Sequence, residues 1–248
     1  MPTASEIKLF RSLKDKSART EHGLFAAETP KVVADLIAGG MQAEILYVLH
    51  ESVSVWQKRF PGIKVESVSD KELERLSFLK QAHEVSAVFR IPEQKKFEQQ
   101  NVTLILDNIG DPGNMGTILR TAHWFGIGNI ICTENSVDVY NPKVVQSTMG
   151  SLAHVNVLYC GKDEISSLLD KNTTVCGTYM EGQSLYAAEF QLPVAFIIGS
   201  EARGIETLES LVQRRISIPA RHNENHPESL NASVAAAIIM SVVSKINE

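Results

Sequence analysis

Short apolar runs alternate with amphipathic stretches along most of the chain, a pattern typical of strands alternating with helices. In the second half, continuous apolar runs such as the one at 194–198 suit strands that are buried on both faces of a parallel sheet. This half predicts strands over residues 102–106, 129–132, 174–177, 194–198 and 216–218, and helices near 114–125, 142–148, 163–169 and 230–246.

The first part of the chain alternates in the same way and predicts a small α/β sandwich. The polar stretch 91–101 contains a proline and has no helix or strand periodicity, so it is interpreted as a linker. We therefore expect an N-terminal domain over residues 1–96 and a parallel-sheet α/β domain over 97–248. In the first domain the pattern predicts helices near 5–16, 30–38, 53–59 and from Ser69 onward, and strands near 24–27, 45–49, 63–66 and 85–89.

Composition places the chain among soluble globular proteins. Its 248 residues are 44% hydrophobic and 21% charged, and no apolar run approaches the roughly 20 residues of a membrane span. The N-terminus has no apolar signal core, so a cytoplasmic protein is expected. Cys132, Cys160 and Cys176 are far apart, odd in number and set in apolar surroundings, which favours buried free thiols over a disulfide framework or a zinc site.

Charge is divided unevenly along the chain. Residues 1–96 carry 15 Lys and Arg against 13 Asp and Glu, a net charge of +2, whereas residues 97–248 carry 9 against 16, a net charge of −7. A polyanionic partner is therefore expected on the first domain, although a solvated helix face would have the same composition. Between positions 7 and 20, Asp15 stands alone against Lys8, Arg11, Lys14, Lys16 and Arg19.

Three polar segments follow predicted strands of the second domain, where α/β sheets build their sites. The first, 108–116, is rich in Gly and Asn and leads into a helix that carries Arg120, but it contains neither a GxGxxG nor a P-loop motif. In the second, 199–204, Glu201 and Arg203 could pair with each other or grip a polar ligand. In the third, Ser229 is an N-cap by type, and Asn231 lies in the first turn of the last helix.

Together, these segments resemble the motifs of the SpoU (TrmH-like) RNA 2′-O-ribose methyltransferases of the SPOUT superfamily. Their order and approximate spacing match as well, and the stretches 7–14 and 21–28 resemble the substrate-binding domain that such enzymes often carry. The matching residues are Asn114, Gly116 and Arg120 in the first segment, Gly199, Glu201 and Gly204 in the second, and Pro219, Ser229, Leu230, Asn231, Ser233 and Val234 in the third.

The resemblance implies a fold, a cofactor and an assembly. The fold is a parallel sheet closed by a trefoil knot, and S-adenosylmethionine is held in that knot largely by backbone groups, so no metal is needed. The family is dimeric through this domain, and the active site is completed across the subunit contact. The positions that match the cofactor-binding role are Thr178, Gly199, Ile218 and Leu230.

The resemblance also implies a reaction, in which a ribose 2′-hydroxyl attacks the sulfonium methyl group. By family analogy Arg120 removes the hydroxyl proton or stabilises the developing oxyanion, and we favour the second role because a guanidinium stays protonated. Asn114, Glu201, Ser229 and Asn231 would orient Arg120 and the ribose. Ribosomal RNA is expected rather than transfer RNA because of the N-terminal domain, where Lys8, Arg11, Lys14 and Arg19 are candidate RNA contacts.

Two departures from the family pattern bear on these expectations. Thr29 follows Glu28 where the family usually has glycine, and the loop at 220–228 is longer than usual and carries His222 and His226. No third metal ligand is visible near these histidines, which favours a mobile polar loop over a metal site. Two alternatives stay open. The first is a non-catalytic RNA- or ribosome-binding module, which calorimetry with S-adenosylmethionine would distinguish from an enzyme. The second is a nucleotide- or NAD-dependent enzyme, against which the absence of the GxGxxG and P-loop motifs argues.

Overall fold

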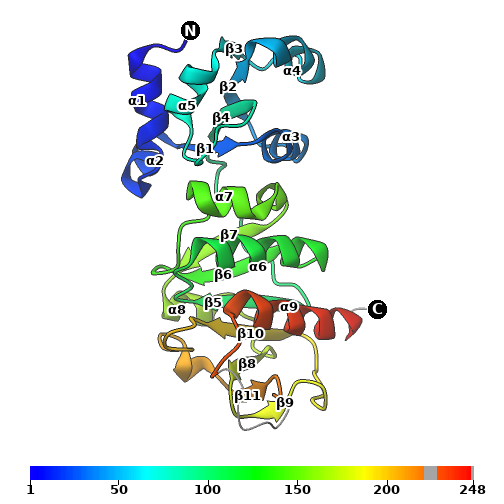
Figure 1. Ribbon diagram of the computed structural model, residues 1–248. Helices are drawn as coiled ribbons and strands as arrows, with labels where there is room; N and C mark the ends of the chain where they lie inside the picture. Colours follow the sequence, from blue (N-terminus) through cyan, green and yellow to red (C-terminus); the bar gives the residue numbers. More distant parts are fainter. Residues whose placement is uncertain (221–227, 247–248) are drawn as a thin grey trace. The chain divides into compact units, whose positions relative to one another are not determined.

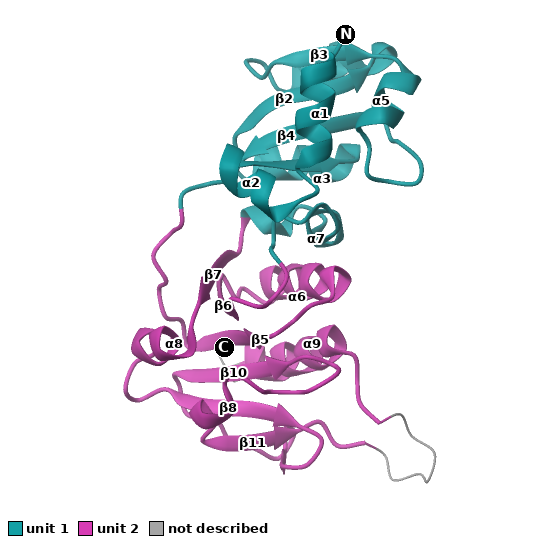
Figure 2. Ribbon diagram, turned by 90° about the vertical axis from the view of Figure 1, so that its left-hand side faces the viewer, with its two compact units in different colours: residues 1–93, 138–153 teal, residues 94–137, 154–248 magenta. Residues whose placement is uncertain are grey.

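The computed structural model describes residues 1–220 and 228–246 and divides the chain into two compact units (Figures 1 and 2). The first unit contains residues 1–93 together with 138–153, and the second contains 94–137 and 154–248 apart from the residues outside the description. Segment 138–153 therefore packs with the N-terminal part of the chain although it lies beyond the linker in sequence.

The first unit is built on a four-stranded sheet with the order β1-β4-β2-β3. Strand β4 pairs antiparallel with β1 and β2, and β2 pairs parallel with β3. The strands are β1 (Leu24–Glu28), β2 (Ala43–Leu49), β3 (Val65–Val68) and β4 (Val85–Arg90), and the α-helices of this unit are α1 (Ala4–Ser12), α2 (Lys16–His22), α3 (Pro30–Ala38), α4 (Val53–Arg59), α5 (Asp70–Leu76) and α7 (Pro142–Thr148).

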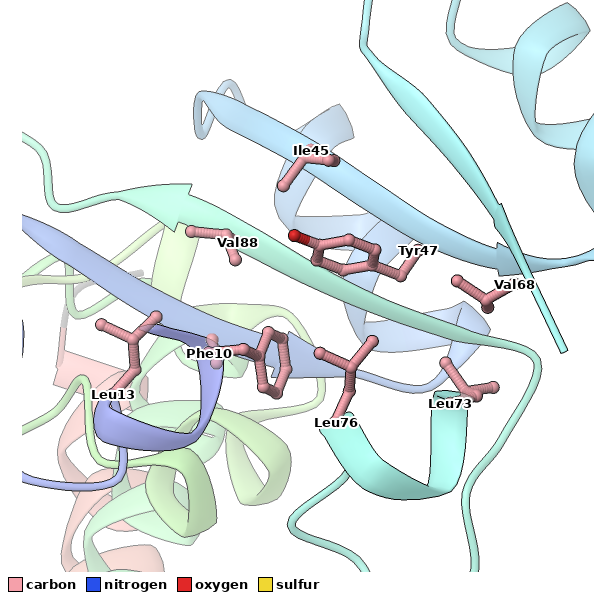
Figure 3. Close-up of a cluster of buried hydrophobic side chains, with 9 residues drawn as sticks. Phe10, Leu13, Ile45, Tyr47, Val68, Leu73, Leu76 and Val88 are labelled. Atoms are coloured by element: carbon pink, nitrogen blue, oxygen red, sulfur yellow. The ribbon is translucent and has the colours of Figure 1, made fainter. Parts of the chain in front are cut away.

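One core cluster of this unit lies between the sheet and helices α1 and α5 (Figure 3). Phe10 is fully buried, stacks on Phe78 with ring centroids 5.3 Å apart, and meets the edge of Tyr47. Burying an aromatic ring of this size stabilises the fold by roughly 1.5–3 kcal/mol. The cluster joins Phe10, Leu13, Ala26, Ile45, Tyr47, Val68, Leu73, Leu76 and Val88.

The single helix predicted over 5–16 is wrong, because the chain forms two helices separated by a turn at 13–15. Leu13 ends α1 as a fully buried residue of the core. Arg19 donates to the backbone carbonyls of Leu13 and Lys14, each at 2.9 Å. The guanidinium thus satisfies acceptors that a longer α1 would have bonded internally.

Segment 138–153 joins the first unit through side-chain contacts. Asp138 accepts from Arg19 at 2.5 and 2.9 Å, in a pair whose arginine side chain is 3% exposed. The ring of Tyr140 lies 5.0 Å from that of Phe25. Gly150 adopts a φ of +91°, and a Cβ atom there would stand 2.4 Å from Cβ of Asp35, so only glycine permits this close approach.

The second unit is a seven-stranded sheet with the order β7-β6-β5-β10-β8-β11-β9, in which every described strand pair is parallel. Helix α8 covers one face of the sheet, and α6 and α9 cover the other, where they pack against each other (Figure 2). Its elements are β5 (Val102–Asp107), α6 (Pro112–Trp124), β6 (Asn129–Thr133), β7 (Asn156–Cys160), α8 (Lys162–Leu168), β8 (Thr174–Tyr179), β9 (Gln183–Ser184), β10 (Val194–Gly199), β11 (Arg214–Ser217) and α9 (Ala232–Val243).

The predicted α/β class with a parallel sheet is confirmed, while the sequence missed β7 and β9. Every residue of β5 is buried, as its continuous apolar run predicts. Strand β11 begins at Arg214 and ends at Ser217, earlier than the predicted 216–218. The trefoil knot stays a prediction.

The structure bears on two expectations drawn from the composition, one about the cysteines and one about membrane spans. All three cysteines are buried and free, and burial raises the pKa of Cys160 to about 11. No helix among the residues the structure describes is long and apolar enough to span a bilayer.

Candidate active site

The first part of the site is the start of α6, directly after β5. Asp111 is the N-cap, and its carboxylate accepts from the backbone N–H of Asn114 at 2.8 Å. Pro112 occupies the first helical position, where its missing N–H costs nothing. The helix therefore begins two residues before the predicted start, and Asn114 lies within its first turn rather than opening it.

The second part is the start of α9, where Asn231 is the N-cap. Its Oδ1 accepts from the backbone N–H groups of Ser233 and Val234 at 2.9 and 3.3 Å, and from the Ser233 hydroxyl at 2.6 Å. The expectation that Ser229 caps this helix is wrong. Ser229 lies two residues before the cap and is exposed.

Asn231, Asn114 and Glu201 form a directed relay of side chains from three separate segments. Because Oδ1 of Asn231 is held by the helix amides, its Nδ2 faces Asn114 and donates to Oδ1 of that residue at 2.9 Å. The amide of Asn114 is thereby oriented with its own Nδ2 toward Glu201, and it donates to Oε1 of the carboxylate. The relay leaves Glu201 as its terminal acceptor.

Glu201 lies on a tight loop that follows β10. Ser200 and Gly204 exchange two backbone hydrogen bonds of 3.0 and 2.8 Å across this loop. Gly199 has no space for a side chain, because a Cβ atom there would stand 2.1 Å from the carbonyl carbon of Gly204. Arg203 pairs with Glu206 at 3.3 Å, so the ion pair that the sequence suggested between Glu201 and Arg203 is not formed.

A cavity of about 520 Å³ lies beside the relay, between the ends of β8, β10 and β11 and the first turns of α9. It includes all four positions expected to hold the cofactor. Glu201 and Ser229 also contribute to its lining, together with the apolar residues that form its walls. The described lining residues are Thr178, Tyr179, Met180, Ile198, Gly199, Ser200, Glu201, Gly204, Ile216, Ile218, Pro219, Ala220, Ser229, Leu230, Ala232, Ala235 and Ile239.

The cavity has the chemical character that S-adenosylmethionine requires. Its volume lies in the range of small-molecule sites, and its walls are mainly apolar, which suits an adenine ring. Among the described lining residues Glu201 is the one charged group, and a carboxylate suits a cationic sulfonium. Burial, followed by the hydrogen bond to Glu209, raises the pKa of Tyr179, so this phenol stays protonated near neutral pH.

Arg120 lies on the same helix as Asn114, six residues further on, and is exposed. The described residues that line the cavity do not include it. One turn before it, Thr117 faces an open groove between α6 and α9. The groove is lined by Thr117, Tyr186, Ser233, Val234, Ala237, Ile238 and Ser241.

The basic residues of the first unit do not share one role. Arg19 is 2% exposed and bonded to Asp138 and two carbonyls, so the expectation that it contacts RNA is wrong. Arg11 is exposed but donates to the carbonyl of Ser77 at 2.5 Å, and its guanidinium lies over the ring of Phe78. Lys8 and Lys14 are exposed.

The loop with His222 and His226 lies outside the described residues, so the structure does not bear on the expectation made for it. In the described part of the chain, no three His, Cys, Asp or Glu residues are grouped as metal ligands.

Sequence reasoning missed a buried carboxylate beneath the Glu201 loop. Asp107 ends β5, is fully buried, and accepts from the backbone N–H groups of Glu206 and Leu208 at 2.8 and 3.1 Å. Asn108 follows it with a φ of +57° and donates from Nδ2 to the hydroxyl of Thr207 at 2.9 Å. The signal available in the sequence was an acidic residue at the end of an otherwise apolar strand.

Comparison with protein families identifies the class. Residues 101–241 match the SpoU rRNA Methylase family, and residues 4–87 match the MRM3-like substrate binding domain. The chain therefore belongs to the SpoU rRNA methylase family, the RNA 2′-O-methyltransferases that use S-adenosylmethionine, and the resemblance found in the three sequence segments is confirmed.

Individual relatives agree with this assignment over the whole chain. RlmP of Bacillus subtilis (strain 168), a 23S rRNA (guanosine(2553)-2′-O)-methyltransferase, is 26% identical over 239 residues, which are 95% of this chain and 94% of the relative. A solved TrmH-family structure from Porphyromonas gingivalis is 33% identical, with a TM-score of 0.87 and 98% of both chains covered. AviRb from Streptomyces viridochromogenes, solved with AdoMet, has a TM-score of 0.87 at 22% identity and covers 99% of this chain and 98% of its own, which shows a shared fold.

Proposed function

We propose that this protein methylates the 2′-hydroxyl of a ribose in ribosomal RNA. The observation that carries the proposal is the relay from Asn231 through Asn114 to Glu201 at the rim of an apolar cavity. Hydrogen-bonded polar groups from three segments beside a cavity that suits the methyl donor support methyl transfer to a sugar at this point. The similarity to RlmP along nearly the full length supports ribosomal rather than transfer RNA as substrate.

In this proposal the site residues have different roles. Thr178, Gly199, Ile218 and Leu230 hold the cofactor against the apolar walls, and Ser229 and Asn231 border the ribose. The cofactor, when bound, supplies an electrophilic methyl group. Asn114 and Glu201 fix the sugar hydroxyl in line for attack, which lowers the barrier by several kcal/mol. Arg120 stabilises the developing negative charge on the ribose oxygen while the hydroxyl proton passes to water.

We propose further that the active protein is a homodimer joined through the groove between α6 and α9. This groove is bordered by Val234, which is 46% exposed, and Trp124 on α6 is 84% exposed. Such large exposed apolar side chains on neighbouring helices are typical of an interface. Wild-type protein is expected to be dimeric in light scattering and Val234→Glu monomeric, and a monomeric wild type would contradict the proposal.

In this dimer Arg120 would complete the partner's active site. Support comes from its exposed position one turn beyond Thr117 of the groove, away from the described lining of its own cavity. Mixing Arg120→Ala with Glu201→Ala chains tests this arrangement. If Arg120 acts across the contact, mixed dimers regain one intact site and activity returns, whereas no recovery would place Arg120 in its own subunit's site.

The N-terminal unit is proposed to bind the RNA, with the exposed Lys8 and Lys14 as contacts. The substrate is tested by incubating ribosomal and transfer RNA from cells lacking the gene with the protein and labelled S-adenosylmethionine, followed by nucleoside mass spectrometry. A 2′-O-methyl nucleoside in ribosomal RNA is expected. Label in transfer RNA alone would mean that transfer RNA, and not ribosomal RNA, is the substrate. Binding of S-adenosylmethionine without methyl transfer would favour a non-catalytic module.

A further inference from the structure

The buried carboxylate of Asp107 has no part in the roles proposed above, yet it occupies a costly position. It is fully buried, and its Oδ1 has no hydrogen-bond partner among the described residues. A buried oxygen left without a partner destabilises a fold, so its presence calls for a compensating function. Its second oxygen, Oδ2, suggests that function, because it accepts the two backbone N–H groups of Glu206 and Leu208.

The next residue carries a second local cost and makes a contact with the same segment. Asn108 has a φ of +57°, a backbone conformation that residues other than glycine rarely adopt. Its side chain donates to the hydroxyl of Thr207, between the two residues held by Asp107. Its backbone N–H donates to Thr133 at 2.8 Å, which anchors it to β6. Asp107 and Asn108 thus bind three consecutive residues of one loop, 206–208.

That loop is the segment that carries Glu201. It leaves β10 at Gly199, turns through the reciprocal bonds of Ser200 and Gly204, and reaches the carboxyl end of β5 at 206–208. The end of β5 therefore fixes the far end of the loop, while β10 fixes the near end. Asn114, the partner of Glu201, lies in the first turn of α6, which follows the same end of β5 through the short segment 108–111.

We propose that Asp107 and Asn108 are positioning residues for methyl transfer, forming a clasp with residues 206–208 that holds Glu201 within reach of Asn114. The inference rests on the proposed role of Glu201 and names residues that set its position. A carboxyl group serves better than an amide here, because an amide would place N–H donors where Oδ1 has no hydrogen-bond partner among the described residues. The positive φ of Asn108 fits this role, because such backbone conformations are concentrated at functional sites.

The test measures kcat of full-length protein on its RNA substrate for Asn108→Gly, which tolerates the positive φ but removes the contact with Thr207. We expect about a tenfold fall in kcat with little change in KM for RNA, and Thr207→Val is expected to give a similar fall. Asp107→Ala should lower kcat further, and Asp107→Asn should recover part of that loss. Val157→Ala in the distant strand β7 is the control for a general loss of stability.

The decisive comparison repeats Asn108→Gly in a Glu201→Ala background. If the clasp acts through Glu201, the second substitution changes kcat by less than about twofold there. The same tenfold fall in both backgrounds, or wild-type kcat in Asn108→Gly alone, would overturn the clasp while leaving the proposed function intact. A wild-type protein that transfers no methyl group to RNA would instead remove the proposed function, and the clasp with it.

Discussion

Asn231 performs two tasks with two different atoms, and one substitution separates them. Its Oδ1 caps α9 by accepting from the N–H groups of Ser233 and Val234, and its Nδ2 donates to Asn114. Asn231→Asp keeps an oxygen for the helix amides but removes the donor. Asn231→Ala removes both. The pair therefore distinguishes helix capping from orientation of the relay.

The stability effect follows from the cap. Loss of an N-cap side chain costs ~1 kcal/mol, so Asn231→Ala should lower Tm by roughly 2–4 °C in a chain of this size. Asn231→Asp should leave Tm near that of the wild type, because a carboxylate also interacts favourably with a helix N-terminus. Thermal unfolding followed by circular dichroism measures this difference.

The activity effect follows from the relay. In Asn231→Asp the amide of Asn114 would turn its Nδ2 toward the new carboxylate and its oxygen toward Glu201. One hydrogen bond is lost and two oxygens face each other, so kcat should fall about tenfold, which corresponds to ~1.4 kcal/mol of activation free energy. Methyl transfer from labelled S-adenosylmethionine measures kcat. Wild-type kcat in Asn231→Asp would refute the relay, and equal Tm values for both variants would refute the cap.

Three further outcomes are expected. Arg120→Ala should lower kcat at least about 100-fold with unchanged affinity for S-adenosylmethionine in calorimetry, and undiminished turnover would remove Arg120 from the mechanism. Arg19→Ala leaves Asp138 without its partner and should cost ~3 kcal/mol of unfolding free energy in urea titration, whereas a change below about 1 kcal/mol would show the pair to be dispensable. The hydrogen bond from the Ser69 N–H lowers the pKa of Glu72, so this bond stabilises the fold above the ordinary carboxyl value of 4.5 and loses that effect as the pH falls. Glu72→Gln should therefore be less stable than wild type at pH 7 and equally stable in acid. A difference in stability that does not change with pH would contradict this.

Much of the second unit could be predicted because its strands are long apolar runs whose burial follows from composition alone. β5 and β10 lie within one residue of their predicted bounds. In the first unit, α7 likewise begins and ends where the sequence places it. β7 was missed because it begins with a polar residue, Asn156, and is only partly buried at the sheet edge. Its residues also do not alternate between apolar and polar, which is the pattern that predicts a half-buried strand.

The details that failed depend on contacts between residues far apart in sequence. Ser229 and Asn231 are both residue types that cap helices well. In the structure Asn231 is the N-cap of α9, and its side chain also bonds Asn114 on a distant segment. The break between α1 and α2 accompanies the capture of two carbonyls by Arg19, and Arg19 is itself fixed by Asp138, 119 residues away. The role of Arg19 was mistaken for the same reason, since composition shows charge but not burial.

The claim that side chains from separate segments act as one site is tested most directly by a double-mutant cycle on kcat between Asn114→Ala and Glu201→Ala. Each single substitution should lower kcat about tenfold or more. If the two side chains work as a unit, the double variant should be no slower than the slower single one, within about threefold. A fall in kcat of the double variant equal to the product of the two single falls would mean that these residues act independently. That result would contradict the claim that they form one site.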